Sequence, residues 1–332
     1  MPSTGTTPSD ATGTLTACLI VRDEEAHLAD CLASVAPFVD EVVVVDTGST
    51  DGTPGIARAS GARVLSVAWT DDFSAARNAA LAACSTPWVL SLDADERVGG
   101  DPARLRALLD RAPHGDRADA AFGVTMEQAG ADGQVLRLRG AKLFRPALVH
   151  WRGRVHERPV HRSGPRAGVE VAGRPLPRET LLLTHLGYLA EGALAVRALR
   201  NARLAELELD DLIAAGAPAS EIARARLNLG RSLRVHLDPT RGEALLQQVR
   251  SETTPGTPTW LWAVHFLAWE AVRRGDPDTA RGLCVELQAA GAPADYLLNL
   301  AAVIAYALGD AAAGDRFRAQ IARRVDVTGR PC

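Results

Sequence analysis

The amino-acid sequence predicts an α/β domain built on a mostly parallel sheet, followed by an all-α region of helical repeats. In the first hundred or so residues, short apolar runs alternate with stretches of helical spacing, which is typical of a parallel sheet covered by helices. Between about residues 120 and 188, strand-like runs with glycine-rich turns replace this alternation. From about residue 191 the chain is rich in Ala and Leu with helical period. We therefore expect a disordered tail over residues 1–14, an α/β domain over 15–190 and a helical domain over 191–332.

The composition is that of an ordinary globular protein. Its 332 residues carry a formal net charge of −3, which gives no reason to expect nucleic acid as a partner. No apolar run reaches the roughly 18 residues that span a bilayer, and the Ser/Thr/Gly/Pro-rich start lacks the basic and apolar regions of a secretion signal. The five cysteines are scattered and form no C-x-x-C pair, as expected of free thiols in a reducing compartment. We expect a cytoplasmic protein without a membrane span.

Four apolar strands and the helices between them make up the predicted parallel sheet. The second strand holds four consecutive valines, which is typical of a strand buried on both faces. Right-handed crossovers would connect these strands. In chain order the predicted elements are strand Leu15–Val21, helix Glu24–Ala36, strand Glu41–Asp46, helix Pro54–Ser60, strand Arg63–Val67, helix Ser74–Ala83, strand Trp88–Leu92 and helix Asp101–Arg111.

The strands predicted next have no helices between them. They cover Ala120–Gln128, Val135–Arg139 and Ala141–Phe144, and a last strand-like run covers Leu181–Tyr188. The Pro/Gly/Arg-rich stretch Arg158–Arg178 is predicted to be a loop.

The helical region shows a weak internal repeat. Gly275-Asp276 and Gly309-Asp310 lie 34 residues apart, each between two helical stretches, and Asp238-Pro239 resembles Asp276-Pro277. A period of about 34 residues with helix–turn–helix units is typical of tetratricopeptide repeats. The alternative is a plain helical bundle.

The most informative chemistry follows the fourth strand, which ends in Asp93-Ala94-Asp95-Glu96. In open α/β sheets, ligands bind outside the carboxyl ends of the strands. Asp93 and Asp95 share a face of an extended segment, so they repel each other unless a cation lies between them. Carboxylates favour hard ions such as Mg²⁺ or Mn²⁺, which are often shared with substrate phosphates. The alternative is that these acids cap the next helix.

The sequence lacks two other common nucleotide-binding motifs. Neither G-x-G-x-x-G nor G-x-x-x-x-G-K-[ST] is present, which argues against a dinucleotide-binding domain and a P-loop.

Four motifs in order make residues 15–190 resemble family 2 glycosyltransferases of the GT-A fold. They are the opening segment Cys18–Glu25, the strand and loop Asp40–Thr53, the segment Asp71–Asn78 with its Arg-Asn pair, and the Asp-X-Asp triplet Asp93–Asp95. Thr-Gly-Ser, Asp-Asp-Phe-Ser and a helical tail resemble the branch that includes lipopolysaccharide-core and peptide S-glycosyltransferases. Two residues depart from the family pattern, since Asp23 stands in place of Asn and Thr47 in place of the second Asp of Asp-Asp-Gly-Ser.

The resemblance implies a site for a nucleoside diphosphate sugar, most often a UDP-sugar. Asp46 would accept hydrogen bonds from the base or ribose, and Arg77 would lie near the pyrophosphate. The alternatives are a helix-capping Asp46 and a surface Arg77 paired with Asp71 or Asp72. The implied nucleotide-sugar-binding residues are Val21, Asp23, Glu25, Asp46, Gly48, Ser49, Asp51, Arg77, Asn78, Asp93 and Ala94.

The resemblance also implies a divalent ion, Mn²⁺ or Mg²⁺. Asp95 would coordinate it, Asp93 would support it or hold the ribose, and His185 would be an ion or phosphate ligand. The bound ion would neutralise charge on the departing diphosphate.

Direct transfer with inversion needs a base for the acceptor proton. We expect Glu157 or His156 in this role. The alternative for these two residues and for His185 is a satisfied polar residue at a domain junction.

We therefore expect a metal-dependent inverting glycosyltransferase that moves a hexose-like sugar to a saccharide or peptide acceptor. The helical tail would hold part of the acceptor or form a homodimer. The alternative is an interaction protein of the tetratricopeptide type with an inactive glycosyltransferase-like domain.

Overall fold

The computed structural model describes residues 13–113, 119–129, 135–186, 193–234 and 237–329. The chain divides into two compact units, of which the first comprises residues 1–153 and 157–188 and the second residues 154–156 and 189–332. The expected disordered tail falls almost entirely outside the described residues.

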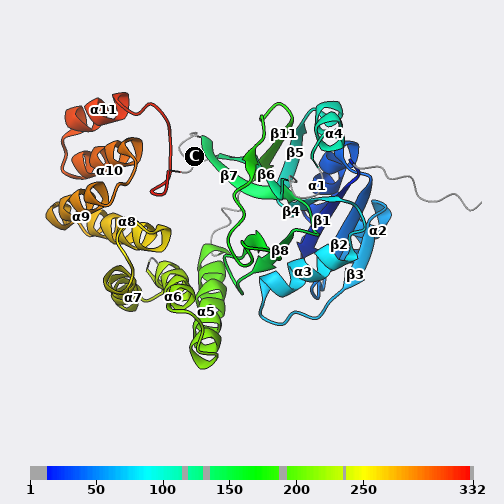
Figure 1. Cartoon of the computed structure of the whole chain (residues 1–332), viewed down its shortest axis with the longest axis horizontal. Coiled ribbons are helices and arrows are strands. Elements are labelled where there is room, and N and C mark those ends of the chain that lie inside the picture. Colours follow the sequence, from blue (N-terminus) through cyan, green and yellow to red (C-terminus); the bar gives the residue numbers. More distant parts are fainter. Residues whose placement is uncertain (1–12, 114–118, 130–134, 187–192, 235–236, 330–332) are drawn as a thin grey trace, which may run out of the picture. The chain divides into compact units, whose positions relative to one another are not determined.

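The first four strands run parallel to one another within a mixed sheet, as predicted (Figure 1). β1 (Leu15–Val21) lies between β2 (Glu41–Asp46) and β4 (Trp88–Leu92), and β3 (Arg63–Ser66) pairs with the other side of β2. The registers bring Val21 opposite Asp46 and Leu19 opposite Leu92. The carboxyl ends of β1, β2 and β4 therefore meet at one edge of the sheet.

Helices pack on both faces of this sheet and form two separate cores. Val44 belongs to the core that includes residues of α1, α2 and α4, whereas its neighbour Val45 belongs to the core that includes residues of α3. The run of valines is thus buried on both faces, as predicted. The helices are α1 (Leu28–Val35), which a 3₁₀ turn (Ala36–Phe38) follows, α2 (Thr53–Ala59), α3 (Phe73–Ala83) and α4 (Pro102–Asp110).

The first helix begins four residues later than predicted, at Leu28 instead of Glu24. Asp23 has a left-handed backbone (φ 53°), and its carboxylate accepts a hydrogen bond from the backbone N–H of Thr50. The N–H of Glu24 donates to Thr53 Oγ1 at 2.7 Å. These acidic residues belong to the loop after β1 because they are bonded to the next loop of the chain.

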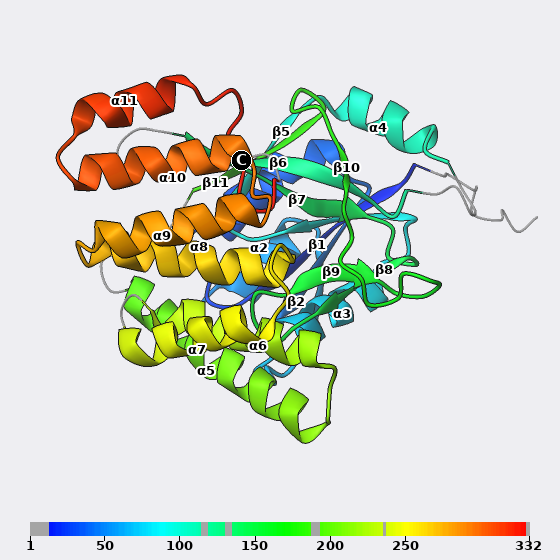
Figure 2. The ribbon, with the colours of Figure 1, turned by 60° about the vertical axis from the view of Figure 1, so that its left-hand side comes forward.

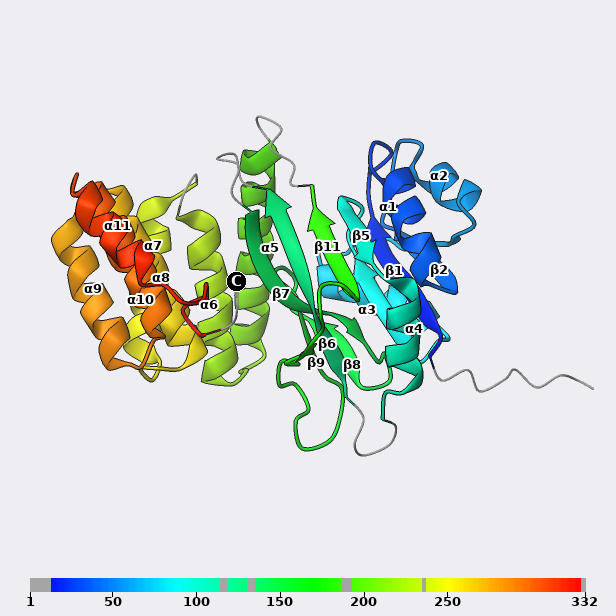
Figure 3. The same cartoon turned by 90° about the horizontal axis from the view of Figure 1, so that it is seen from above.

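Beyond β4 the sheet continues in the order β7-β6-β11-β5, and Figure 3 labels these four strands. β7 is one continuous strand where the sequence predicted two, since Gly140 stays paired with Val124 and the irregularity lies nearer the end of the strand. β5 was not predicted because it holds one apolar residue, Val98, and two glycines. It forms by antiparallel pairing with β11. The strands are β5 (Glu96–Gly100), β6 (Ala121–Ala129), β7 (Val135–Phe144) and β11 (Leu181–His185).

The predicted loop over residues 158–178 contains two short strands. β9 (Arg158–His161) pairs with β8 (Val149–Arg152), and β10 (Arg174–Pro175) pairs with β6. Both β9 and β10 contain proline, which lacks a backbone donor and argued against strands in the sequence.

The second unit is built of helices, each packed against the next along the chain (Figure 2). Asp238, Asp276 and Asp310 cap the starts of α7, α9 and α11, each accepting a hydrogen bond from the backbone N–H three residues on. Gly275 and Gly309 end the preceding helices with φ of 71° and 80°. The predicted repeat positions are therefore helix boundaries. The helices are α5 (Ala193–Ala214), α6 (Ala219–Leu233), α7 (Pro239–Glu252), α8 (Pro258–Arg273), α9 (Pro277–Ala289), α10 (Ala294–Ala307) and α11 (Ala311–Ala319).

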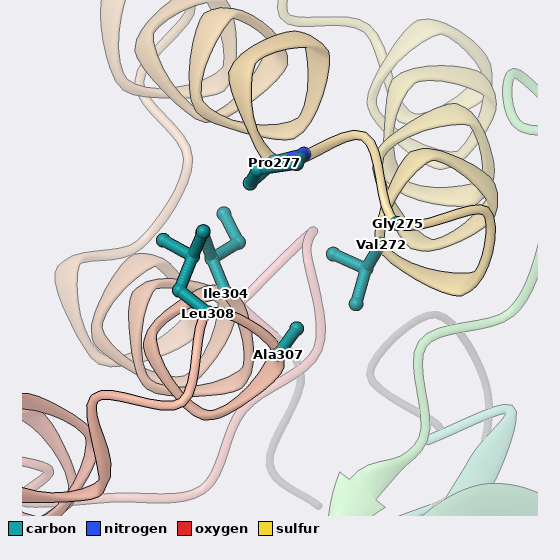
Figure 4. Close-up of a pocket in the computed structure, with 6 residues that line it drawn as sticks. All are labelled: Val272, Gly275, Pro277, Ile304, Ala307 and Leu308. Atoms are coloured by element: carbon teal, nitrogen blue, oxygen red, sulfur yellow. The ribbon is translucent and has the colours of Figure 1, made fainter.

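A small cavity of about 100 Å³ lies between helices of this unit (Figure 4). The residues that line it, which include Val272, Ile304 and Leu308, have no polar side chains. It offers no charged group that could bind a polar substrate.

The expectations about thiols and membrane spans agree with the described residues. Cys18, Cys31, Cys84 and Cys284 are unpaired, and burial raises the pKa of the Cys31 thiol to about 12. Cys332 lies outside the described residues. None of the described helices has the length and apolarity that crossing a bilayer requires.

Candidate functional site

Most of the predicted site residues lie at or after the carboxyl ends of β1, β2 and β4. Asp46 is the last residue of β2, and Asp93 follows β4 directly. Parallel pairing brings these strand ends together. This edge is where α/β sheets bind ligands.

The loops after β1 and β2 are bonded to each other. The backbone N–H of Asp23 donates to Ser49 Oγ at 3.0 Å, and the N–H of Thr50 donates back to Asp23 Oδ1 at 2.6 Å. Asp46 accepts bonds from the N–H and the hydroxyl of Ser49 through Oδ1. The two predicted nucleotide-binding loops therefore form one structure.

Glu25 and Asp51 add a second pair of bonds between the same loops. The N–H of Gly52 donates to Glu25 Oε2 at 2.9 Å, and the N–H of Glu25 donates to Asp51 Oδ2 at 3.1 Å. Gly48 has φ of 107°, which a residue with a Cβ rarely adopts. The turn at Gly48 lets Ser49 reach Asp23 and Asp46.

Val21, Thr47 and Ala94 contribute their backbone. The carbonyl of Val21 accepts bonds from both the N–H and the hydroxyl of Thr47, each at 3.0 Å. The threonine that replaces the family's second aspartate is thus a buried structural residue. The side chain of Ala94 is buried, and its carbonyl accepts a bond from Arg97.

Arg77 of α3 joins three other segments of the chain. Its Nη2 donates to Asp93 Oδ1 at 2.8 Å, its Nε to Glu157 Oε1 at 2.6 Å and its Nη1 to Ser91 Oγ at 3.2 Å. The residue is 8% exposed, so the alternative of a surface arginine paired with Asp71 or Asp72 is wrong. Burial acts to lower the pKa of Arg77, but the carboxylates of Asp93 and Glu157 outweigh it and raise the pKa.

The neighbouring Asn78 uses its amide on the backbone of β8. Its Nδ2 donates to the carbonyl of Trp151 and its Oδ1 accepts from the N–H of Trp151, both at 2.9 Å. Trp151 in turn lies 5.1 Å from the Arg77 guanidinium. In this structure Asn78 thus anchors β8 beside Arg77.

Asp93 also binds a second cation, Lys142 of β7. Lys142 Nζ lies 2.9 Å from Asp93 Oδ2 and 3.1 Å from Glu96 Oε1. Burial acts to raise the pKa of Asp93, yet Lys142 and Arg77 hold it well below its usual range. Glu96 is 2% exposed, and burial raises its pKa against the opposing effect of Lys142.

Asp95 faces His185 at the end of β11. The distance from His185 Nε2 to Asp95 Oδ2 is 3.2 Å, and the hydrogen bond to Asp95 raises the pKa of His185. His185 Nδ1 is buried and finds no hydrogen-bond partner among the described residues. The carboxylate of Asp95 suits Mn²⁺ or Mg²⁺, and the imidazole of His185 lies beside it as a second, nitrogen ligand, so these residues fit the implied ion. Gly187 and Tyr188 of the same motif lie outside the described residues.

The two candidate bases, although adjacent in sequence, lie in different surroundings. Glu157 is bonded to Arg77 and shares its network with Asp93. His156 has φ of 53°, and its Nε2 lies 3.4 Å from Ser232 Oγ of α6 within the second unit. Burial, with a contribution from nearby arginines, lowers the pKa of His156 to about 3. The structure therefore brings Glu157 to Asp93 and does not bring His156 there.

The sequence motifs do not include Lys142, Glu96 or Ser91 among the candidate site residues. Lys142 is the only lysine in a chain with 37 Lys and Arg residues, which was a signal of an unusual position. Glu96 was visible as the acid after Asp-X-Asp, but nothing in the sequence paired it with a lysine 46 residues away.

The first part of the chain is similar to known glycosyltransferases. The model of the family described as glycosyl transferase family 2 matches residues 16–161. A TPR repeat-containing protein of Synechococcus elongatus is 49% identical over 129 residues, which are 39% of this chain and 30% of that protein. The lipopolysaccharide core biosynthesis glycosyltransferase LpsC of Rhizobium meliloti is 37% identical over 103 residues, covering 29% of this chain and 35% of LpsC.

Among solved structures, residues 1–349 of S. aureus TarS in complex with UDP-GlcNAc give a TM-score of 0.39 at 15% identity. The match covers 92% of this chain and 90% of that chain. The chain spans about 30% of the length of the first curated relatives that it matches.

Proposed function

Because the chain carries a glycosyl transferase family 2 domain followed by a helical region, we propose that it transfers a hexosyl group from a nucleoside diphosphate sugar to an acceptor. The observation that carries the proposal is the Arg77 network. Arg77 joins Asp93, from the Asp-X-Asp segment, to Glu157, the candidate base. Donor and base residues from separate segments are thus held together by one buried cation.

The donor lies against the loops after β1 and β2 in this proposal. Asp46 and Ser49 face the base or ribose, and the glycine turn at Gly48 leaves the backbone open to close approach. A UDP-sugar is the donor that we expect from the resemblance. The remaining candidates on these loops set the loop geometry. Asp23 is bonded to Ser49 and Thr50, and the N–H of Glu25 donates to Asp51.

Transfer proceeds by attack of an acceptor hydroxyl or thiol on the anomeric carbon. The bond from this carbon to the diphosphate oxygen breaks as the new bond forms on the opposite face, which inverts the anomeric configuration. Glu157 takes the acceptor proton, and the nucleoside diphosphate leaves with the electron pair of the broken bond.

Asp95 and His185 would hold the divalent ion, Mn²⁺ or Mg²⁺. When bound, such an ion stabilises the negative charge that develops on the leaving diphosphate. Asp93, fixed by two cations, is available to orient the donor.

The acceptor is a saccharide or a peptide side chain in this proposal. The match to a lipopolysaccharide core glycosyltransferase supports a saccharide. Stacked helical arrays bind extended partners, so the helical region over 191–332 would hold part of the acceptor or a second copy of the chain. We propose a cytoplasmic location and keep 15–190 as the limits of the catalytic domain.

Thermal unfolding against a panel of nucleoside diphosphates, with and without Mn²⁺, tests the donor site. A ligand present at 100 times its dissociation constant adds about 2.7 kcal/mol to the free energy of unfolding, which gives a visible shift. We expect a shift with one nucleotide that requires the metal in the wild type and is lost in Asp95→Asn.

Release of the nucleoside diphosphate from its sugar, with candidate saccharides and peptides, then tests turnover. A folded protein that binds no nucleotide would favour the other candidate function, an interaction protein with an inactive glycosyltransferase domain. The match to a TPR repeat-containing protein is the observation that keeps that candidate open.

A further inference from the structure

The chain's only lysine occupies an irregular position in β7. Phe122 of β6 pairs with Leu143 and Gly123 pairs with Ala141, so the register skips Lys142. A bulge of this kind leaves one residue unpaired and re-aims its side chain. Here the unpaired residue is Lys142, and its ammonium reaches Asp93, the residue directly after β4.

Lys142 completes a ring of charges around Asp93. Its Nζ binds Asp93 Oδ2 at 2.9 Å, while Arg77 Nη2 binds Asp93 Oδ1 at 2.8 Å. Glu96 contacts the same ammonium through both oxygens, at 3.1 and 3.2 Å, and Glu96 Oε2 accepts the backbone N–H of Asp93 at 2.9 Å. Lys142 is 14% exposed, so this ammonium is largely shielded from water.

The two aspartates of the Asp-X-Asp segment are therefore not equivalent. Each carboxylate oxygen of Asp93 already contacts a cation, whereas Asp95 contacts His185. An ion brought to Asp93 would be repelled by the positive charges of both Lys142 and Arg77. Within the part of the chain that the structure describes, no three His, Cys, Asp or Glu side chains converge as a metal-ligand group.

We propose that Lys142 is a positioning residue that keeps Asp93 out of metal coordination, so that the ion binds through Asp95 and His185 and only together with the donor's diphosphate. Two side chains leave most positions of a six-coordinate ion to water and phosphate oxygens. Metal and nucleotide then bind cooperatively, and the protein alone holds the metal weakly. This inference rests on the proposed function.

The test measures free Mn²⁺ by electron paramagnetic resonance during titration of the full chain, with and without UDP. The wild type is expected to bind Mn²⁺ at least about tenfold more tightly with UDP, within the range of about 5- to 150-fold typical of coupled sites. Asp93→Asn should leave Mn²⁺ binding without UDP unchanged, whereas Asp95→Asn should remove Mn²⁺ binding.

A variant in which Lys142 no longer binds Asp93 gives a sharper test than the single aspartate variants. Lys142→Met alone would leave Glu96 buried without a cation, so Lys142→Met is combined with Glu96→Gln. This double variant should bind Mn²⁺ about tenfold more tightly without UDP and lose most of the coupling, because Asp93 becomes available as a third ligand. Lys142→Arg retains the charge and should behave as the wild type.

Three outcomes overturn the inference. They are equal Mn²⁺ affinity of the wild type with and without UDP, loss of Mn²⁺ binding in Asp93→Asn, and no gain of affinity in a folded double variant. If the double variant does not fold, the comparison of Asp93→Asn with Asp95→Asn still decides the matter. If the panel of nucleoside diphosphates gives a shift with a nucleotide other than UDP, the titration uses that nucleotide, and failure of the wild type to bind any of them contradicts the proposed function instead.

Discussion

Arg77 Nε donates a 2.6 Å hydrogen bond to Glu157 Oε1, which lies 80 residues further along the chain. The same guanidinium binds Asp93 and Ser91, so one buried side chain fixes β4, its loop and the segment that carries the candidate base. A displacement of Asp93 would therefore shift Glu157, the candidate base, because Arg77 is bonded to both.

Replacement of Arg77 should destabilise the first unit and abolish turnover. Arg77→Met leaves Glu157 without the cation that binds it and leaves Asp93 with Lys142 alone, and breaking a buried pair costs about 3 kcal/mol or more. Urea denaturation measures this loss. Arg63→Met is the matched control, since Arg63 pairs with Glu41 at an exposed position and its loss should cost less than about 1 kcal/mol. Equal losses in the two variants would contradict the buried role of Arg77.

Replacement of Glu157 tests whether this residue is the catalytic base or only a hydrogen-bond partner of Arg77. Glu157→Gln keeps a side chain that can accept from Arg77 but cannot take a proton. If Glu157 is the base, kcat should fall about 10²- to 10⁴-fold while the KM for the donor stays near the wild-type value. A raised donor KM with little change in kcat would instead mean that Glu157 only positions Arg77. His156→Asn, on the adjacent residue, should change kcat by less than about tenfold because His156 contacts Ser232.

The helical unit should lose stability as the pH falls below 6.5. The pKa values of His156 and His265 are lowered to about 3, in both cases mainly by burial. The unfolded chain, with histidine pKa values near 6.5, therefore binds more protons than the folded one between pH 3 and 6.5. Above pH 6.5 these two histidines do not lower the free energy of unfolding. Below pH 6.5 each of them lowers it by up to about 1.4 kcal/mol per pH unit.

This pH dependence is measurable with one variant. His265 Nδ1 lies 2.7 Å from the Tyr296 hydroxyl, within an aromatic cluster of α8 and α10. His265→Phe keeps the ring and removes the titrating group. Urea midpoints between pH 7 and pH 5, followed by tryptophan fluorescence, should fall less steeply in His265→Phe than in the wild type. Parallel curves would show that His265 does not contribute.

Arg231 of α6 should be replaceable with a gain in stability. Burial and the neighbouring Arg234 lower its pKa to about 10, and no hydrogen bond or ion pair joins it to the described residues. Arg231→Met removes an uncompensated charge and keeps the aliphatic stem, so the free energy of unfolding should rise by about 1 kcal/mol. Arg234→Met is the control of opposite sign, because Arg234 binds the buried Glu270. A loss of stability in Arg231→Met would mean that its charge is balanced in solution.

The strands that the sequence predicted well are those whose apolar runs are buried on both faces. β1, β2 and β4 begin and end at the predicted residues because each run is bounded by polar residues. β5 and β9 were missed because pairing with β11 and β8, and not their own composition, makes them strands. The late start of α1 follows from bonds that Asp23 and Glu24 make to the next loop.

The sequence suggests the members of the candidate site that stand together in one segment, and it does not suggest those that come together only through contacts between distant segments. Asp93 and Asp95 stand together in the sequence, and the motif order led to Arg77. Lys142 is 49 residues from Asp93, and its aim depends on a bulge that no sequence pattern indicates. His156 and Glu157 are adjacent in the sequence and were predicted together as candidate bases. The left-handed backbone of His156 turns the chain there, so the two side chains have different surroundings.

The solitary lysine also provides a chemical reporter. Acylating reagents that modify lysine side chains have a single such target in this chain, Lys142, whose ammonium is engaged by Asp93 and Glu96. Because these carboxylates raise the pKa of Lys142 against the effect of burial, the amine should stay protonated and resist acylation while the ring is closed. The rate at which this residue gains mass therefore measures how often the contacts of Lys142 with Asp93 and Glu96 open.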